Sequence, residues 1–347
     1  MTPPREKPAP TLLSPLARAA EPLYRWEITR RNRAFDRGEG VTTLDRPVLS
    51  VGNLSVGGTG KTPTVRRLLS WLLEAGHRPC VAMRGYKSTP AVESDEAAAH
   101  RRAFPTVPIV AQPDRIAGLH ALFETQVGRD TDCVVLDDGF QHRRLGRDFD
   151  LVLVDASRNP FRDRLIPAGW LREPVESLAR ASAVVVTHAE LATPEALERL
   201  CVDVERAHAR PPLAVTTHDW TELDVLAETG ESTKPVSILR GTRSLAVCAI
   251  GNPHAFIDSA RGAVGDGRLE TIVLRDHDPY KPPTLEAIIE HARLIDAHTI
   301  ITTDKDWSKL ADVAPDRWPC PVARPRLRLG FARGEEALRE AVLGAVR

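Results

Sequence analysis

The sequence predicts an α/β fold: a P-loop-type, mainly parallel sheet with flanking helices, a second, smaller α/β domain, and an N-terminal amphipathic helix. Three observations support it. From Pro47 onward, short β-branched runs alternate with helical patterns, as in a parallel sheet covered by helices. A glycine-rich loop follows the first of these runs. A polar, acidic stretch between residues 219 and 235 indicates a domain junction or an excursion of the second half. We therefore expect domains over residues 1–46, 47–210 and 211–347.

The first 46 residues combine an apolar stripe with positive charge. Residues 1–37 hold eight basic and four acidic side chains, 8 − 4 = +4, which the rest of the chain balances. Two interpretations stay open: an amphipathic helix packed on the domain, or an interfacial helix over residues 12–33 that meets lipid. Pro22 is expected to kink it. The stripe is Leu13, Leu16, Ala20, Leu23 and Tyr24, and the arginines are Arg25, Arg30, Arg31, Arg33 and Arg37.

The elements of the core domain follow in order from residue 48. The spacing of Val65, Leu68 and Leu72 predicts a helix over residues 62–75, which Gly76 ends, and a charged helix is expected over residues 194–208. Short apolar runs predict the strands Val48–Val51, Cys80–Met83, Ile109–Ala111, Cys133–Leu136, Leu151–Val154 and Val184–Thr187.

A second series of strands and helices follows the acidic stretch. We expect strands at Leu245–Ile250, Thr271–Leu274 and Thr299–Thr302, and helices at Thr284–Asp296 and Glu335–Val346.

Composition excludes several classes of protein. The 47 basic and 47 acidic residues cancel, which argues against nucleic acid as a partner, and no obligate protein partner is evident. No run of roughly 18 apolar residues occurs, and the first residues lack the pattern of a secretory signal. The five cysteines are scattered through apolar runs, so we expect buried thiols in a reducing cytoplasm.

The strongest motif is the glycine-rich loop between the first predicted strand and the first core helix. Its glycines let backbone N–H groups curl around phosphate, Lys61 can reach the β- and γ-phosphates, and the Thr62 hydroxyl can ligate magnesium. The strict pattern asks for glycine where this chain has Ser55. The candidate nucleotide-binding residues are Gly57, Gly58, Thr59, Gly60, Lys61 and Thr62.

A phosphate-binding loop needs a carboxylate to organise its metal. Asp137 and Asp138 end an apolar strand at the sheet edge that faces the loop, so both are candidates for binding magnesium directly or through water. The spacing leaves open which aspartate touches the metal.

Taken in order, the motifs closely resemble the tetraacyldisaccharide 4'-kinase family, the lipid A 4'-kinases. The two most specific strings are SVGNLSVGGTGKTP at residues 50–63 and DDGFQHRR at residues 137–144. The others are Arg84-Gly85-Tyr86, Asp95-Glu96, PAGWLREP at 167–174, Gly251-Asn252-Pro253, residues 276–280 and TTDKDWSK at 302–309.

The resemblance implies an activity and a location. The γ-phosphate of ATP would be transferred to the 4'-hydroxyl of a tetraacylated glucosamine disaccharide 1-phosphate, giving lipid IVA in lipid A biosynthesis. The enzyme would need Mg²⁺ and would bind peripherally to the anionic inner membrane at its cytoplasmic face. A two-domain fold with the active site in the cleft and a lipid-engaging N-terminal helix is also implied.

The resemblance also assigns roles residue by residue. Asp95 matches the catalytic aspartate, with His277 as its histidine partner and Lys61 at the phosphates. Thr62 and Asp138, with Asp137, would form the metal site. A carboxylate suits the base role because a sugar hydroxyl must lose its proton as the phosphoryl group arrives. Substrate-binding candidates are Arg84, Tyr86, Arg115, Gln141, His142 and Arg172.

One rival interpretation is a P-loop GTPase or metallochaperone-like switch. It would want an N/T-K-x-D motif, and the nearest stretch, Asp304-Lys305-Asp306, does not fit. A second is a nucleotide-gated module that docks on membranes, which leaves Asp95, His277 and the arginines without a task. The chain departs from the family pattern at Ser94, Lys87, Asp278 and Asp304.

Overall fold

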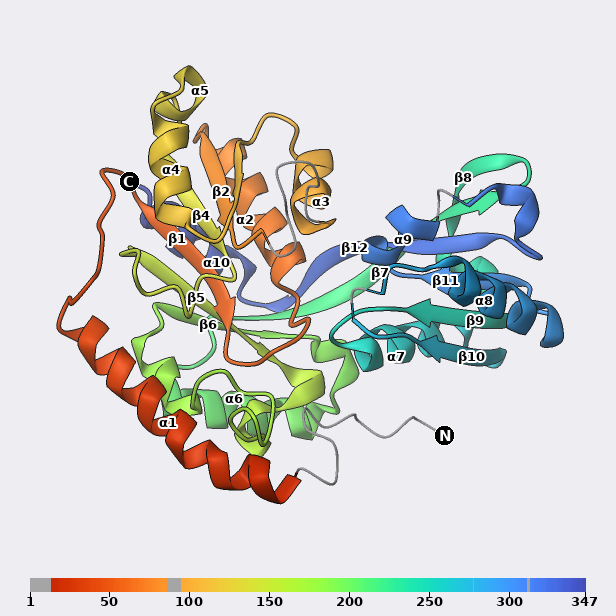
Figure 1. Ribbon diagram of the computed structural model, residues 1–347, viewed down its shortest axis with the longest axis horizontal. Coiled ribbons are helices and arrows are strands. Elements are labelled where there is room, and N and C mark those ends of the chain that lie inside the picture. The colour runs from red at the N-terminus through yellow and green to blue at the C-terminus, as the bar shows by residue number, and fades with distance from the viewer. Residues whose placement is uncertain (1–13, 86–94, 277, 311–312) are drawn as a thin grey trace. The chain divides into compact units, whose positions relative to one another are not determined.

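The computed structural model describes residues 14–85, 95–276, 278–310 and 313–347 (Figure 1). The chain forms two compact units, each treated by itself below. The first holds residues up to Thr217 together with Phe331–Arg347, and the second holds His218–Gly330. This division differs from the expected ranges, because the last helix packs in the first unit.

The sheet of the first unit is parallel, with the order β7-β6-β5-β1-β4-β2-β3. The phosphate-loop strand β1 therefore lies between β4 and β5. The strands are β1 (Val48–Asn53), β2 (Pro79–Met83), β3 (Ile109–Ala111), β4 (Cys133–Asp137), β5 (Phe149–Asp155), β6 (Ala183–Thr187) and the start of β7 (Ala214–Ala227).

The helices of the first unit are α1 (Ser14–Asp36), α2 (Lys61–Glu74), α3 (Asp95–Ala103), α4 (Arg115–Phe123), α5 (Gln126–Arg129), α6 (Pro194–His208) and α10 (Glu335–Gly344). Short 3-10 helices are Ala156–Arg158, Pro160–Arg162, Val175–Arg180 and Ala189–Leu191.

Both faces of this sheet are covered, so its central strands are buried on each side. Alternate strand residues such as Leu49 and Val51 pack under α2 and α10. The opposite residues pack against α4 at one end of the sheet and α6 at the other. Leu338 and Val342 of α10 belong to the core that contains Trp71 of α2, which explains why the C-terminal residues join the first unit.

The second unit has the parallel strand order β10-β9-β11-β12, with β8 paired antiparallel to β7. Helix α7 covers one face, and α8 and α9 cover the other. The strands are β8 (Gly230–Pro235), β9 (Arg243–Cys248), β10 (Arg268–Val273), β11 (Thr299–Thr302) and β12 (Val322–Arg333). The helices are α7 (Pro253–Val264), α8 (Pro282–Leu294), α9 (Asp304–Leu310) and the 3-10 turns Val236–Leu239 and Pro315–Arg317.

The acidic stretch at residues 219–235 is ordered structure and not a plain linker. It forms the second half of β7 and the hairpin strand β8. Its carboxylates pair with arginines of β12: Arg324 lies 3.0 Å from Asp224, and Arg326 lies 3.1 Å from Glu222. Long-range charge pairing of this kind leaves no local signal, so both β12 and the β7–β8 hairpin escape sequence inspection.

All five cysteines are buried and unpaired, as the sequence predicts. Within the described ranges, no helix has the length and apolarity needed to cross a bilayer.

Candidate active site

The glycine-rich loop joins β1 to α2. Gly60 adopts a left-handed conformation with φ 82° and precedes the first helical residue, Lys61, without a side-chain cap. The N–H groups at the start of α2 therefore have no side-chain cap, which suits an anion. Ser55, where the strict pattern has glycine, forms a β-bridge with Leu171, so this extended position does not need glycine.

Lys61 joins a charged cluster at the carboxyl edge of the sheet. Its Nζ lies 3.1 Å from Asn53 Oδ1 and 3.5 Å from Asp138 Oδ1. Arg172 donates to both Asp138 carboxylate oxygens at 2.8 and 2.7 Å, and also to Asn53 Oδ1 at 2.5 Å. Such a bidentate contact is the geometry with which guanidinium groups grip carboxylate and phosphate. The cluster brings together the predicted phosphate-binding lysine, a predicted metal ligand and a predicted substrate residue.

The backbone around Asp138 explains why its side chain turns toward these cations. Its φ is 54°, which breaks the extended path of β4, and buried Arg115 donates to its carbonyl oxygen at 3.1 Å. Burial alone would raise the pKa of Asp138, but the charges of Lys61, Arg172 and Arg115 outweigh it and hold the pKa far below its ordinary value. Asp138 is therefore a fixed negative charge.

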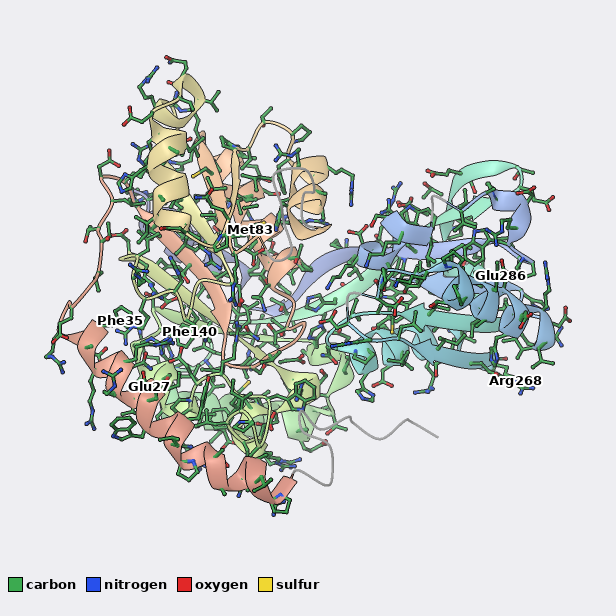
Figure 2. The ribbon with its side chains drawn as sticks, in the orientation of Figure 1. Glu27, Phe35, Met83, Phe140, Arg268 and Glu286 are labelled. Carbon is green, nitrogen blue, oxygen red and sulfur yellow. The ribbon has the colours of Figure 1, made fainter. Side chains whose placement is uncertain are left out.

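Gln141 and His142 follow on the same loop. Gln141 Nε2 donates to the carbonyl of Asn53 at 2.9 Å and so ties this loop to the end of β1. Burial, reinforced by the charges of Arg115 and Arg147, lowers the pKa of His142 to about 4. His142 is thus neutral at physiological pH. Phe140, which directly precedes Gln141 and is labelled in Figure 2, is fully buried. A Cβ at Gly52 would lie 2.5 Å from the Phe140 Cβ, so glycine is needed there.

Asp137 has a different neighbour from Asp138. It ends β4, is almost fully buried, and its Oδ2 lies 3.1 Å from Nε2 of His100 on α3. Among the described residues, no lysine or arginine forms an ion pair with Asp137. His100 was not singled out in the sequence, because a histidine in an alanine-rich helix gives no signal of a contact 37 residues away.

Several predicted residues lie outside what the structure describes. Tyr86 and His277 are outside the described residues. Asp95 begins α3, but its side chain is not among those described. Arg84 is exposed after β2. The assignment of a catalytic base therefore stays a prediction.

A second buried acid–base pair lies at the ends of β5 and β6. Asp155 Oδ1 is 3.1 Å from Nδ1 of His188 and accepts from both the N–H and the hydroxyl of Ser157 at 2.9 and 2.6 Å. Thr187 donates to the carbonyl of Thr59 in the phosphate loop at 3.0 Å. Sequence analysis did not single out these residues, of which Thr187 bonds directly to the phosphate loop.

Helix α1 is bonded to the segment that carries Arg172. Tyr24 donates its hydroxyl to the Arg172 carbonyl at 2.9 Å, and Asn32 donates to buried Glu173 at 2.8 Å. On the other face, large apolar side chains stand in solvent: Leu16 is 69% exposed, Leu23 69% and Trp26 61%. The helix thus has a packed face, as the first interpretation expects, and an exposed apolar face, while contact with lipid stays a prediction.

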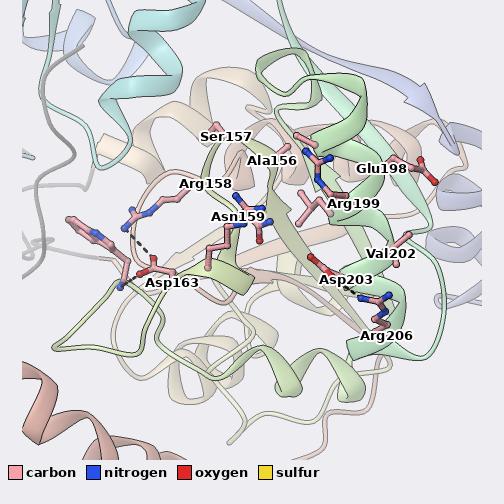
Figure 3. Close-up of a pocket in the computed structure, with 14 residues that line it drawn as sticks. Ala156, Ser157, Arg158, Asn159, Asp163, Glu198, Arg199, Val202, Asp203 and Arg206 are labelled. Carbon is pink, nitrogen blue, oxygen red and sulfur yellow. Dashed lines mark hydrogen bonds and ion pairs between the residues drawn. The ribbon is translucent and has the colours of Figure 1, made fainter. Parts of the chain in front are cut away.

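A cavity of about 750 Å³ lies between the segment after β5 and helix α6 (Figure 3). Its charged lining is Arg158, Arg162, Arg199 and Arg206 with Asp163, Glu198 and Asp203. Arg158 lies over the ring of Trp170, 4.2 Å from its centroid, and the Trp170 carbonyl accepts from the N–H of Val56 in the phosphate loop at 2.8 Å. The cavity is a neighbour of the phosphate loop, and none of the described candidate site residues lines it.

The oxygen donors fit magnesium in type. Mg²⁺ in phosphoryl-transfer sites takes one or two protein ligands and completes its shell with water and phosphate oxygens. Thr62 at the start of α2 and the carboxylates that end β4 are such hard donors. Among the described residues, no three His, Cys, Asp or Glu side chains gather as a metal-binding group. Because Asp138 is held by two cations, Asp137 is the carboxylate less compensated by positive charge.

Comparison with known proteins gives a consistent result. The model of the tetraacyldisaccharide-1-P 4'-kinase family, LpxK, matches residues 10–347. The tetraacyldisaccharide 4'-kinase of Chlorobium luteolum is 32% identical, covering 96% of this chain and 98% of its own. That of Anaeromyxobacter sp. strain K is 34% identical, covering 98% and 93%. A crystal structure of LpxK from Aquifex aeolicus in complex with ATP superposes with a TM-score of 0.67 at 28% identity, covering 97% and 99%.

Proposed function

The chain belongs to the tetraacyldisaccharide-1-P 4'-kinase family and is a kinase of lipid A biosynthesis, and from this premise we propose how its site acts. It transfers the γ-phosphate of ATP to the 4'-hydroxyl of a tetraacylated glucosamine disaccharide 1-phosphate. The observation that carries the proposal is the convergence of Lys61 and Arg172 on Asp138 beside the start of α2, in a chain that the family model matches from residue 10 to its end.

The phosphate loop binds the triphosphate of ATP. The N–H groups around Gly60 and the positive end of α2 receive phosphate oxygens, and Lys61 moves its charge from Asp138 to the phosphates. The ATP complex of the Aquifex aeolicus relative supports ATP as the nucleotide. Gly57, Gly58, Thr59 and Thr62 complete the loop.

The magnesium site is formed by the Thr62 hydroxyl and by Asp137, directly or through water, while Asp138 stays paired with Arg172. A bound Mg²⁺ would neutralise charge on the β- and γ-phosphates. The positive end of the site then consists of Lys61 and Arg172, whose task is to offset the charge of the transferring phosphoryl group.

The acceptor hydroxyl is activated by Asp95, with His277 orienting that carboxylate. The hydroxyl oxygen attacks the γ-phosphorus as the bond to the β–γ bridging oxygen breaks; Asp95 takes the hydroxyl proton, and ADP leaves. Arg84, Tyr86, Arg115, Gln141 and His142 are proposed to line the acceptor.

Contact with an anionic membrane at the cytoplasmic face of the inner membrane is proposed for the exposed side of α1. The exposure of Leu16, Leu23 and Trp26 supports it, since such residues anchor helices at the lipid interface. Replacing all three with serine should lower binding to anionic vesicles at least tenfold while thermal stability stays unchanged, measured by vesicle co-sedimentation and calorimetry. Equal binding of both forms would contradict the assignment.

The deciding experiment incubates the chain with Mg-ATP and the tetraacyl disaccharide 1-phosphate in detergent, with mass detection of one added phosphate. Asp95→Ala should abolish product and leave ADP affinity near that of the unsubstituted chain, because the base does not hold the nucleotide. Absence of product with vigorous GTP hydrolysis would favour the switch interpretation instead.

A further inference from the structure

We propose that His100 is a positioning residue for the phosphoryl transfer: it fixes the Asp137 carboxylate at the end of β4 and ties that carboxylate to helix α3, which begins at Asp95. The inference rests on the proposed function, because it gives Asp137 its place beside the metal. It goes further by naming a residue outside every recognised motif of the chain.

The contact is a buried one. The His100 side chain is 1% exposed and that of Asp137 7%, and their Nε2 and Oδ2 atoms are 3.1 Å apart. Nδ1 of His100 has no hydrogen-bond partner among the described residues. The tautomer with its proton on Nε2 fits this arrangement, since it donates to the carboxylate and leaves only an acceptor nitrogen unpaired.

The surroundings of His100 show that a polar residue is not required there for packing. Helix α3 has the sequence DEAAAHRRA, and its neighbour Ala97 is fully buried. A buried polar side chain lowers stability unless it is hydrogen-bonded, so an apolar residue would suit this position if packing were the only demand. The hydrogen bond to the Asp137 carboxylate explains why an imidazole occupies this buried position.

The contacts of Asp137 and Asp138 differ in how far they neutralise the carboxylate. Lys61 and Arg172 neutralise Asp138, whereas an imidazole N–H orients Asp137 without an ion pair from lysine or arginine. Hydrogen bonds from outer residues typically hold metal-ligating carboxylates in this way, and their loss lowers metal affinity or activity about 10- to 100-fold. Asp137 is therefore oriented without an ion pair from lysine or arginine among the described residues, which leaves its oxygens to a divalent cation.

The same contact also sets the position of α3. The helix is further held by Arg66, which donates to the Ala99 carbonyl at 3.2 Å. Asp95 lies five residues before His100 on this helix. Loss of the His100 contact should therefore disturb both the metal response and the turnover number.

The test compares His100→Leu, which fills the site without a donor, with His100→Gln, whose amide nitrogen can take the place of Nε2. His100→Asn keeps a polar group that is too short to reach, and His120→Leu, at an exposed position of α4, is the matched control. Calorimetry measures ADP affinity with and without Mg²⁺, and kinase assays measure kcat, KM and the Mg²⁺ concentration for half-maximal rate.

For His100→Leu and His100→Asn we expect a 10- to 100-fold smaller gain in ADP affinity on adding Mg²⁺, with unchanged metal-free affinity, and a lower kcat at similar KM for ATP. His100→Gln should recover most of the loss, and His120→Leu should match the unsubstituted chain. An unchanged Mg²⁺ response in His100→Asn, or no recovery in His100→Gln, overturns the proposal. If His100→Leu does not fold, the Gln and Asn pair decides.

These readouts separate the two proposals. If the unsubstituted chain adds no phosphate to the disaccharide lipid, the proposed acceptor is wrong, but the Mg-ADP binding series still decides the role of His100. If the unsubstituted chain transfers phosphate normally and all His100 variants show the same Mg²⁺ response, only the proposed role of His100 is contradicted.

Discussion

The phosphate-loop strand β1 has acidic residues at the ends of both its neighbours, and the two sides are built differently. On the β4 side, Asp138 is one-third exposed and faces two long cationic side chains. On the β5 side, Asp155 is only 4% exposed and its partners are His188 and Ser157. In the proposed mechanism, the partly exposed Asp138 releases Lys61 to a phosphate, whereas the enclosed Asp155–His188 pair serves the fold. The acidic residues that follow the two neighbouring strands thus differ in exposure and in partners, and we expect them to differ in role.

The largest effect that this comparison predicts is at Lys61. Lys61→Ala should lower kcat/KM about 10³-fold, because it removes a charge aimed at the transferring phosphoryl group. Steady-state phosphorylation of the disaccharide lipid measures it, with Lys234→Ala on the exposed strand β8 as control. A decrease in kcat/KM of less than tenfold would show that the charge needed for phosphoryl transfer does not lie on the β4 side of β1.

Arg172→Lys should lower kcat/KM about 10- to 100-fold. Lysine keeps the charge but loses the two-pronged grip on Asp138 and the simultaneous contact with Asn53. The same kinetic assay tests it. Full activity in this variant would mean that only net charge matters there.

Asp155→Asn should act on stability and not on chemistry. Breaking a buried pair costs about 3 kcal/mol of unfolding free energy, while kcat of the folded protein at low temperature should stay within a few-fold. Urea unfolding and kinetics measure the two quantities. The control is Asp203→Asn, whose surface partner Arg206 lies 3.5 Å away and whose loss should cost less than about 0.5 kcal/mol. If Asp155→Asn lowered kcat without lowering the free energy of unfolding, Asp155 would have a catalytic role and not a structural one.

The smallest effect concerns pH. Burial would lower the pKa of His188, but Asp155 outweighs it and the net pKa is raised; burial would raise the pKa of Asp155, but His188 and Ser157 outweigh it and the net pKa is lowered. The contribution of His188 to the free energy of unfolding is fully present below the unfolded pKa of about 6.5. It is lost as pH rises through the pKa in the folded protein. The contribution of Asp155 to the free energy of unfolding is fully present above the unfolded pKa of about 3.9. It is lost as pH falls through the pKa in the folded protein.

The stability difference between the unsubstituted chain and Asp155→Asn should therefore be greatest between about pH 4 and 6.5. It should decline above that range by at most about 1.4 kcal/mol per pH unit, the limit for one proton. Urea unfolding across this range gives the profile. A difference that grows above pH 7 would show that the pair is not an ion pair.

Local patterns correctly predicted the limits of several strands and helices. The strand Ile109–Ala111 and helix Pro194–His208 have the predicted limits, because apolar runs and amphipathic spacing are local signals. Strand β12 was missed because its arginines pair with residues 100 or more positions away. The C-terminal helix was placed in the wrong unit for the same reason, since only three-dimensional packing joins it to Trp71.

The residues of the candidate site also fall into those that the sequence predicted and those that it did not. Lys61, Asp138 and Arg172 were found from motifs, and the structure brings them together. Asn53 and Glu173 lie inside recognised motifs but were not named as candidates, because their contacts with Arg172 and Asn32 join segments far apart in the chain. His100 lies in no motif, and its contact with Asp137 spans 37 residues. Supporting residues of this kind become visible only once neighbouring elements are assembled.

Under the proposed membrane contact of α1, the bonds that join this helix to the Arg172 segment also have a kinetic consequence. Tyr24 bonds to Arg172 and Asn32 to Glu173, and Glu21 pairs with Arg164, so several side-chain contacts attach the helix. A helix resting on a bilayer would then hold Arg172 at a constant height above the lipid plane. The acceptor would be met by lateral diffusion, so turnover in mixed micelles should follow the mole fraction of substrate in the surface and not its bulk concentration.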